Sequence, residues 1–208
     1  LIGEGYRLLA DSGLSANIRA ATLKVAAEGQ RELCRGQGAE WLWNNRPVAL
    51  SGTQVLEIFR SKTAPAFEVA LKVGAALAKR LDDVEDALHH YSESLGIAYQ
   101  IRDDLDDLGD DSAADNNVSI RPSIILALLR ERGKGEVLET MEALWNGRCD
   151  TPPDKPTIRK WAEESGAHEK VMLLLESYKE QAIRSLQEVE IPNLKGLLRR
   201  VIGKIFNE

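Results

Sequence analysis

Four polar side chains recur on one side of a predicted helix near the middle of the sequence. Their spacing of i, i+3, i+4 and i+7 places them on a single helix face. They are Gln100, Asp103, Asp104 and Asp107. Acids three or four residues apart repel each other, at a few tenths of a kcal/mol per pair, so something must offset the repulsion. Because Mg²⁺ prefers oxygen ligands and often binds carboxylates together with phosphates, the stripe predicts either a magnesium-diphosphate site or a solvated acidic surface.

The acidic face borders an apolar seam on the same helix. This seam also follows steps of three and four, and it consists of Ala98, Ile101, Leu105 and Leu108. The two faces lie about 100° apart, so the carboxylates can reach into a cleft beside the core. Arg102 and Asp106 fall off the acidic face and are expected to be solvated.

The composition predicts a single domain, residues 1–208, with a sizeable core, because 43% of the 208 residues are hydrophobic. The net charge of −6 argues against a nucleic-acid partner, which needs clustered Lys and Arg. Cys34 and Cys149 form neither a disulfide framework nor a zinc pattern, which favours a reducing, cytoplasmic location. No apolar stretch approaches the roughly 18 to 20 residues of a membrane-spanning helix.

Apolar residues recur at helical spacing almost everywhere, which predicts an all-α bundle of eight to ten helices. Pro65 is expected either to start or to kink one of them, and Pro122 to lie in the first turn of another. A loop is expected over 109–119. The expected helices cover residues 1–11, 15–43, 53–60, 65–81, 82–108, 120–131, 136–145, 157–165, 167–189 and 192–206.

The acidic segment, read as Gly96-x-x-Tyr99-Gln100-x-x-Asp103-Asp104-x-x-Asp107, resembles the second aspartate-rich motif of the trans-polyprenyl diphosphate synthases. Tyr99 stands where that family usually has Phe. The resemblance implies an isoprenoid synthase-type helical bundle. It also implies that Asp103, Asp104 and Asp107 bind Mg²⁺, which in turn holds a substrate diphosphate.

Two further segments agree with the family in order and spacing. Gly36-Gln37-x-x-Glu40 resembles a Gly-Gln segment that normally ends in Asp, and Lys62-Thr63 resembles a Lys-Thr pair. The resemblance implies that Lys62 supplies charge to a diphosphate and that Thr63 stabilises positive charge through its hydroxyl oxygen. Gln37 and Gln100 would orient the ligands by hydrogen bonding.

The implied reaction is a Mg²⁺-dependent prenyl transfer, which condenses isopentenyl diphosphate with an allylic prenyl diphosphate. The family resemblance also implies a homodimer. Two alternatives remain open. One is a noncatalytic subunit or degenerate member that binds a catalytic partner or a prenyl diphosphate. The other is a class I terpene cyclase, which the Gln and Lys-Thr segments disfavour.

The sequence departs from the family in two further places. Asp82-Asp83-x-x-Asp86 imitates the first aspartate-rich motif, but it lies on the order of 31 Å from the second along one helix, at about 1.5 Å per residue. We interpret these acids as an N-cap and first-turn charges. The true first motif is then expected upstream of Leu1, and the 208-residue chain alone is expected to be nearly inactive.

Arg121-Pro122-Ser123 stands where Lys-x-Thr is common, so Arg121 is expected to replace a lysine charge.

Two other segments receive structural interpretations. His89-His90 lacks an acid or a Cys at a zinc-like spacing, so the pair is assigned to the surface or to packing. The final segment, GLLRRVIGKIF, is interpreted as a packed terminal helix. Its basic amphipathic pattern leaves peripheral membrane contact as a second possibility.

Overall fold

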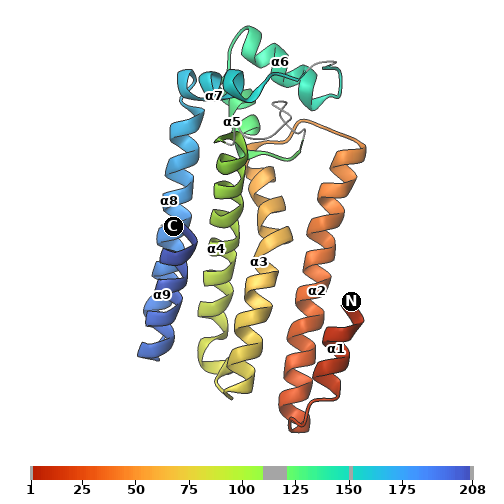
Figure 1. Cartoon of the computed structure of the whole chain (residues 1–208), viewed down its shortest axis with the longest axis vertical. Coiled ribbons are helices and arrows are strands. Elements are labelled where there is room, and N and C mark those ends of the chain that lie inside the picture. The colour runs from red at the N-terminus through yellow and green to blue at the C-terminus, as the bar shows by residue number, and fades with distance from the viewer. Residues whose placement is uncertain (1, 110–120, 150–151, 207–208) are drawn as a thin grey trace.

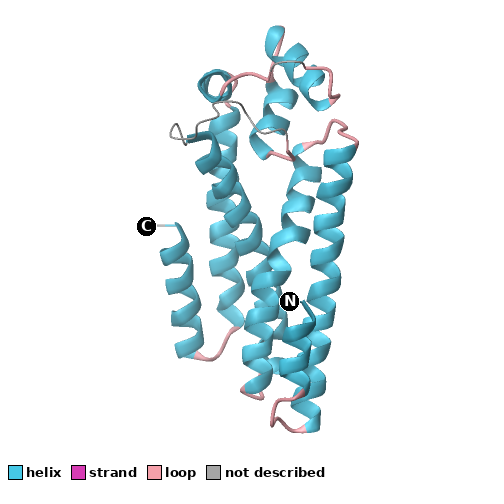
Figure 2. Cartoon of the chain, turned by 45° about the vertical axis from the view of Figure 1, so that its right-hand side comes forward, coloured by secondary structure: helices cyan, strands magenta, loops and turns pink. Residues whose placement is uncertain are grey.

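Four long helices run side by side along the molecule in the computed structural model, which describes residues 2–109, 121–149 and 152–206 (Figure 1). The short helices α5, α6 and α7 gather at one end, and α1 packs against α2 at the other. Figure 2 shows the described chain as helices joined by loops. The helices are α1 (Ile2–Ala10), α2 (Ala16–Asn45), α3 (Gly52–Leu77), α4 (Leu81–Gly109), α5 (Ile124–Arg132), α6 (Glu136–Trp145), α7 (Lys155–Glu164), α8 (Ala167–Ser185) and α9 (Pro192–Phe206).

Two apolar cores hold the helices together. The larger core joins the upper parts of α3 and α4 to α5, α6, α7 and α8, and it contains Trp43 and Trp145 in an edge-to-face contact at 5.3 Å. The smaller core lies between the lower parts of α4 and α8, where α9 inserts Leu198 and Ile202. The terminal segment is therefore a packed helix, as expected. None of the helices in the described ranges has the length and apolarity needed to cross a membrane.

Two glycines allow α3 to contact both of its neighbours at backbone distance. A Cβ added to Gly36 of α2 would lie 2.4 Å from the carbonyl carbon of Ser61. A Cβ added to Gly96 of α4 would lie 2.6 Å from the Cα of Ala64. Both separations are far below van der Waals contact, so only glycine fits either position. The segment containing Lys62 and Thr63 is consequently held between α2 and α4.

The helix predictions are confirmed except at some boundaries. Residues 53–60 and 65–81, expected as two helices, belong to the single helix α3, which begins with a capping box between Ser51 and Gln54. Pro65 lies buried inside this helix. Because proline lacks an amide hydrogen, the helix there loses the hydrogen bond to the Ser61 carbonyl. Packing on both sides of residues 61–64 compensates for that loss.

Other boundaries shift by a few residues. The helix expected from 120 begins at Ile124, because Ser123 caps it and Pro122 precedes the cap. Asp82 and Asp83 lie in the first turn of α4, as expected, but the helix already begins at Leu81, so the N-cap interpretation is wrong. The expected helix 167–189 ends at Ser185 and continues as a 3₁₀ turn. The loop expected over 109–119 lies almost wholly outside the described residues.

The glycine contacts predict different effects on the free energy of unfolding when alanine replaces glycine at two neighbouring positions. Gly36→Ala should lower the free energy of unfolding by about 1 to 3 kcal/mol, because its methyl group meets the backbone of α3. Gly38→Ala, in the same helix, should leave it unchanged or raise it by up to about 1 kcal/mol, because its methyl group meets nothing within 4 Å. Urea unfolding followed by circular dichroism measures both. Equal effects of the two variants would contradict the proposed backbone contact.

Candidate functional site

The carboxyl end of α4 carries a cluster of acids that share one cationic partner. The Arg121 guanidinium lies 3.7 Å from an Asp103 oxygen and 3.4 Å from an Asp104 oxygen, and it also pairs with Asp107. One positive charge thus faces three carboxylates. The exposed fractions of the Asp103 and Asp107 side chains are 45% and 62%, so both carboxylates have room for further ligands.

Asp104 differs from its two neighbours because its side chain is only 5% exposed. Its Oδ2 atom accepts hydrogen bonds from the Ser123 hydroxyl at 2.8 Å, the Ile124 amide at 2.7 Å and the Ile125 amide at 3.3 Å. The same hydroxyl accepts a hydrogen bond from the Leu126 amide. Asp104 therefore anchors the amino end of α5, where free backbone amides favour a negative charge.

Two opposing effects act on the ionisation of Asp104. Burial is the stronger and raises the pKa of this carboxyl above its ordinary value. The Arg121 guanidinium, the Ser123 hydroxyl and the amides of α5 oppose the rise in pKa, because they stabilise the charged form. The stability of the Asp104 anion thus depends on these donors remaining in place.

The electrostatics of this helix end favour a cation. Asp103, Asp106 and Asp107 all lie near the carboxyl end of α4, where the helix dipole is negative. The last turn of α4 contains no basic residue. Acids at this end therefore destabilise the helix unless cations from outside it compensate. Arg121 supplies one such charge, and the excess of negative charge over this arginine is suited to a divalent ion.

A second group of site residues lies between α2 and α3. Lys62 donates a hydrogen bond from its ammonium group to Glu40 at 2.9 Å, and the two side chains are only 11% and 17% exposed. The Lys62 ammonium also lies 5.6 Å from the centre of the Phe59 ring. The structure therefore brings the Gly-Gln segment and the Lys-Thr pair together.

The remaining predicted residues lie on the same three helices. Gln37 is exposed on α2, whereas Thr63 of α3 and Gln100 of α4 are half-buried. Across the part of the chain that the structure describes, no hydrogen bond or ion pair joins the Glu40–Lys62 pair to the acids around Arg121. The two groups are thus separate charge clusters on adjacent helices.

Arg102 was expected to be solvated, and this expectation is wrong. Its guanidinium lies 5.0 Å from the centre of the Tyr99 ring and 5.7 Å from that of Phe206, and it donates a hydrogen bond to the Ile205 carbonyl. Arg102 thus fastens the carboxyl end of α9 beside the acidic cluster. The contact joins residues 103 positions apart, about half the chain, so local periodicity gave no signal for it. Asp106 is exposed as expected, at 69%.

Comparison with known proteins identifies the relationship of this chain. The model of the family described as Polyprenyl synthetase matches residues 1–119, more than half of the sequence. The chain belongs to the polyprenyl synthetase family. The trans-polyprenyl synthase resemblance is thereby confirmed.

Individual relatives of this polyprenyl synthetase family member support the same family assignment. A farnesyl diphosphate synthase of Haemophilus influenzae is 30% identical over 104 residues, which are 48% of this chain and 35% of the relative. A geranylgeranyl diphosphate synthase of Pantoea ananas is 29% identical over 141 residues, which are 66% of this chain and 46% of the relative. The matched part thus spans less than half of each of these relatives.

A solved structure covers almost the whole fold. It is a geranylgeranyl pyrophosphate synthase of Corynebacterium glutamicum, complexed with isoprenyl diphosphate and magnesium. It shares 27% sequence identity with a TM-score of 0.80, and the alignment covers 98% of this chain and 60% of that one. The predicted isoprenoid synthase-type bundle is therefore confirmed.

The burial of Asp104 leads to a prediction about stability. Asp104→Ala should lower the free energy of unfolding by about 2 to 4 kcal/mol, because it removes the acceptor from the amides of α5 and leaves Arg121 with fewer partners. Asp106→Ala, two residues away and exposed, should change it by less than about 0.5 kcal/mol. Thermal and urea unfolding measure both variants. Similar losses would show that Asp104 does not anchor α5.

Proposed function

We propose that this protein is a prenyltransferase that condenses isopentenyl diphosphate with an allylic prenyl diphosphate in a Mg²⁺-dependent reaction. The single observation that carries the proposal is the pair of exposed carboxylates, Asp103 and Asp107, one helical turn apart beside Arg121. Family membership and the magnesium-bound neighbour from Corynebacterium glutamicum support it.

The donor set fits Mg²⁺. The ion needs oxygen ligands and keeps several waters, so it suits two accessible carboxylates and a substrate diphosphate better than a closed protein cage. Asp103 and Asp107 would hold it. Bound there, Mg²⁺ would neutralise charge that develops on departing pyrophosphate.

The sequence also predicts Asp104 as a metal ligand. Because its carboxylate already bonds to Ser123 and the amides of α5, we assign it a positioning role. It would keep Arg121 next to the two metal-binding carboxylates, where the guanidinium can donate to a diphosphate.

The other site residues would act directly on the substrates. Lys62 would exchange its bond to Glu40 for one to a diphosphate oxygen, while Gln37 and Gln100 orient the ligands by hydrogen bonding. As the allylic carbon–oxygen bond breaks, the Thr63 hydroxyl oxygen would face the allylic cation. A new carbon–carbon bond then forms with isopentenyl diphosphate, and the resulting cation would pass a proton to the released pyrophosphate. Preplaced charges of this kind act by stabilising the transition state.

The oligomeric state and the location of the protein belong to the same proposal. We expect the protein to act as a homodimer in the cytoplasm. Contact of α9 with a membrane surface is possible only through its exposed side, because Leu198 and Ile202 are buried in the smaller core.

The deciding experiment measures incorporation of labelled isopentenyl diphosphate into longer prenyl diphosphates by the natural protein. Allylic diphosphates of graded length would serve as co-substrates. We expect Mg²⁺-dependent product that a chelator abolishes. Asp103→Ala should lower turnover on the order of 10²-fold or more, as for the loss of one electrostatic contact to developing charge. Asp106→Ala is the matched control and should retain turnover, because this exposed side chain pairs with Arg102 and not with Arg121.

The same experiment separates the enzyme from the noncatalytic alternative. Mg²⁺-dependent binding of an allylic diphosphate without any turnover would contradict the enzyme and support a binding subunit. Turnover of a single allylic diphosphate to a hydrocarbon would instead support a cyclase.

Lys62 provides an independent prediction about binding. Lys62→Gln should weaken the affinity for a nonhydrolysable allylic diphosphate analogue about tenfold, because one charge-assisted contact is lost. Lys24→Gln removes an exposed lysine from α2 and should have no effect. Titration calorimetry in magnesium buffer measures both affinities. Unchanged affinity in the Lys62 variant would remove it from the diphosphate site.

A further inference from the structure

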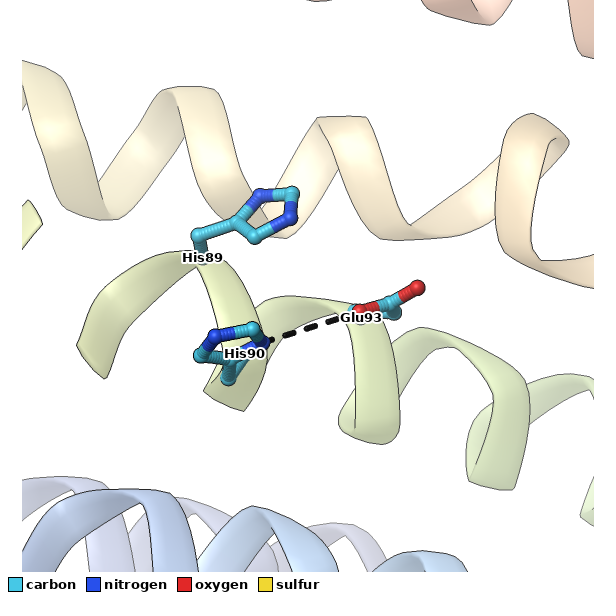
Figure 3. A group of neighbouring side chains, drawn as sticks. All are labelled: His89, His90 and Glu93. Carbon is cyan, nitrogen blue, oxygen red and sulfur yellow. Dashed lines mark ion pairs between the residues drawn. The ribbon is translucent and has the colours of Figure 1, made fainter. Parts of the chain in front are cut away.

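A second group of side chains with metal-ligating atoms lies on the same helix but far from the acids around Arg121. His89, His90 and Glu93 each offer a ligand atom, and these atoms all lie within 4.8 Å of one another (Figure 3). Between His89 and Asp103 the helix rises about 21 Å, at about 1.5 Å per residue. The cluster is therefore distinct from the proposed magnesium site.

We propose that His89, His90 and Glu93 bind a first-row transition-metal ion of the Zn²⁺ or Co²⁺ type. Two imidazoles and one carboxylate form a ligand set that such ions prefer and that Mg²⁺ does not. Three protein ligands would leave a coordination position for water.

Two residues of α3 hold the ligands in orientations that suit a metal. Glu68 contacts the Nδ1 atom of His89 at 3.0 Å. A carboxylate in this position can accept the Nδ1 proton of His89, and the Nε2 atom is then left for a metal. Metal-binding histidines are commonly oriented by a carboxylate in this way.

Glu93 is oriented by a comparable contact. Its Oε1 atom accepts a hydrogen bond from Arg60 at 3.1 Å, while its Oε2 atom lies 3.9 Å from Nδ1 of His90. One carboxylate oxygen is thus engaged by α3 and the other faces a histidine. The dashed line in Figure 3 marks this ion pair of His90 and Glu93.

The surroundings admit and attract a cation. Two sets of ion pairs beside the cluster contain four carboxylates and two cationic side chains between them. These are Glu57, Glu68, Glu85 and Glu93 with Arg60 and Lys72. The negative excess raises the local concentration of cations. His90 and Glu93 also line a surface hollow of about 390 Å³ between α4 and α8, together with Arg184 and Glu188, so a hydrated ion reaches them without unfolding of the chain.

The test is a Co²⁺ titration of the 208-residue chain, followed by visible absorption and by calorimetry in excess Mg²⁺. We expect one Co²⁺ per chain, displaced by Zn²⁺. His90→Ala and Glu93→Gln should each weaken the affinity at least tenfold. Glu68→Gln should weaken it about tenfold, as is typical for a residue that orients a metal ligand. Circular dichroism should show unchanged helicity, because the two histidines are exposed.

Two matched controls make the result decisive. His168→Ala removes the only other histidine, which is exposed on α8, and it should leave Co²⁺ binding unchanged. The double variant Asp103→Asn, Asp107→Asn should also leave it unchanged. The proposal is overturned if no Co²⁺ binds, if the His90 variant binds as tightly as the natural chain, or if only the aspartate variant loses binding.

Discussion

Backbone contact between α3 and its two neighbours is the constraint on which the candidate site depends. Gly36 and Gly96 have no side chains, so α2 and α4 approach the turn of α3 that contains Lys62 and Thr63. Beside this contact, Glu40 of α2 and Lys62 of α3 pair at 2.9 Å. The same turn contains Pro65 and lacks one backbone hydrogen bond, so the neighbouring helices hold a segment that is weak on its own.

The acids of the stripe have two different roles because they differ in burial. Asp104 faces the amino end of α5 and contributes to the fold, whereas Asp103 and Asp107 remain accessible and repel each other. All of them lie at the unfavourable end of the dipole of α4. A protein selected only for stability would not keep exposed acids there. This conflict between local electrostatics and stability is typical of a functional site.

Local sequence patterns predicted the structural features that depend on nearby residues. They missed the contacts that depend on residues far away in the sequence. The helices and the acidic face follow from periodicity, and Ser123 carries a cap signal, although the predicted helix began before it. The contacts of Arg102 with Phe206 and of Asp104 with α5 depend on tertiary packing. His89 and His90 are exposed, as expected. The premise that no acid lies at a ligand spacing from them was wrong, because Glu93 is one helical turn away.

The charges of the candidate site are already paired before any ligand enters. Lys62 pairs with Glu40, and Arg121 pairs with Asp103 and Asp107. In the proposed enzyme, Lys62 and Arg121 would exchange these carboxylates for diphosphate oxygens, and Asp103 and Asp107 would then be free to hold Mg²⁺. The two cationic side chains, which are 11% and 26% exposed, would therefore keep an anionic partner before and after the ligand binds. Because an unpaired, largely buried charge is costly, this pairing lets the site hold its cations without a loss of stability before the ligand arrives.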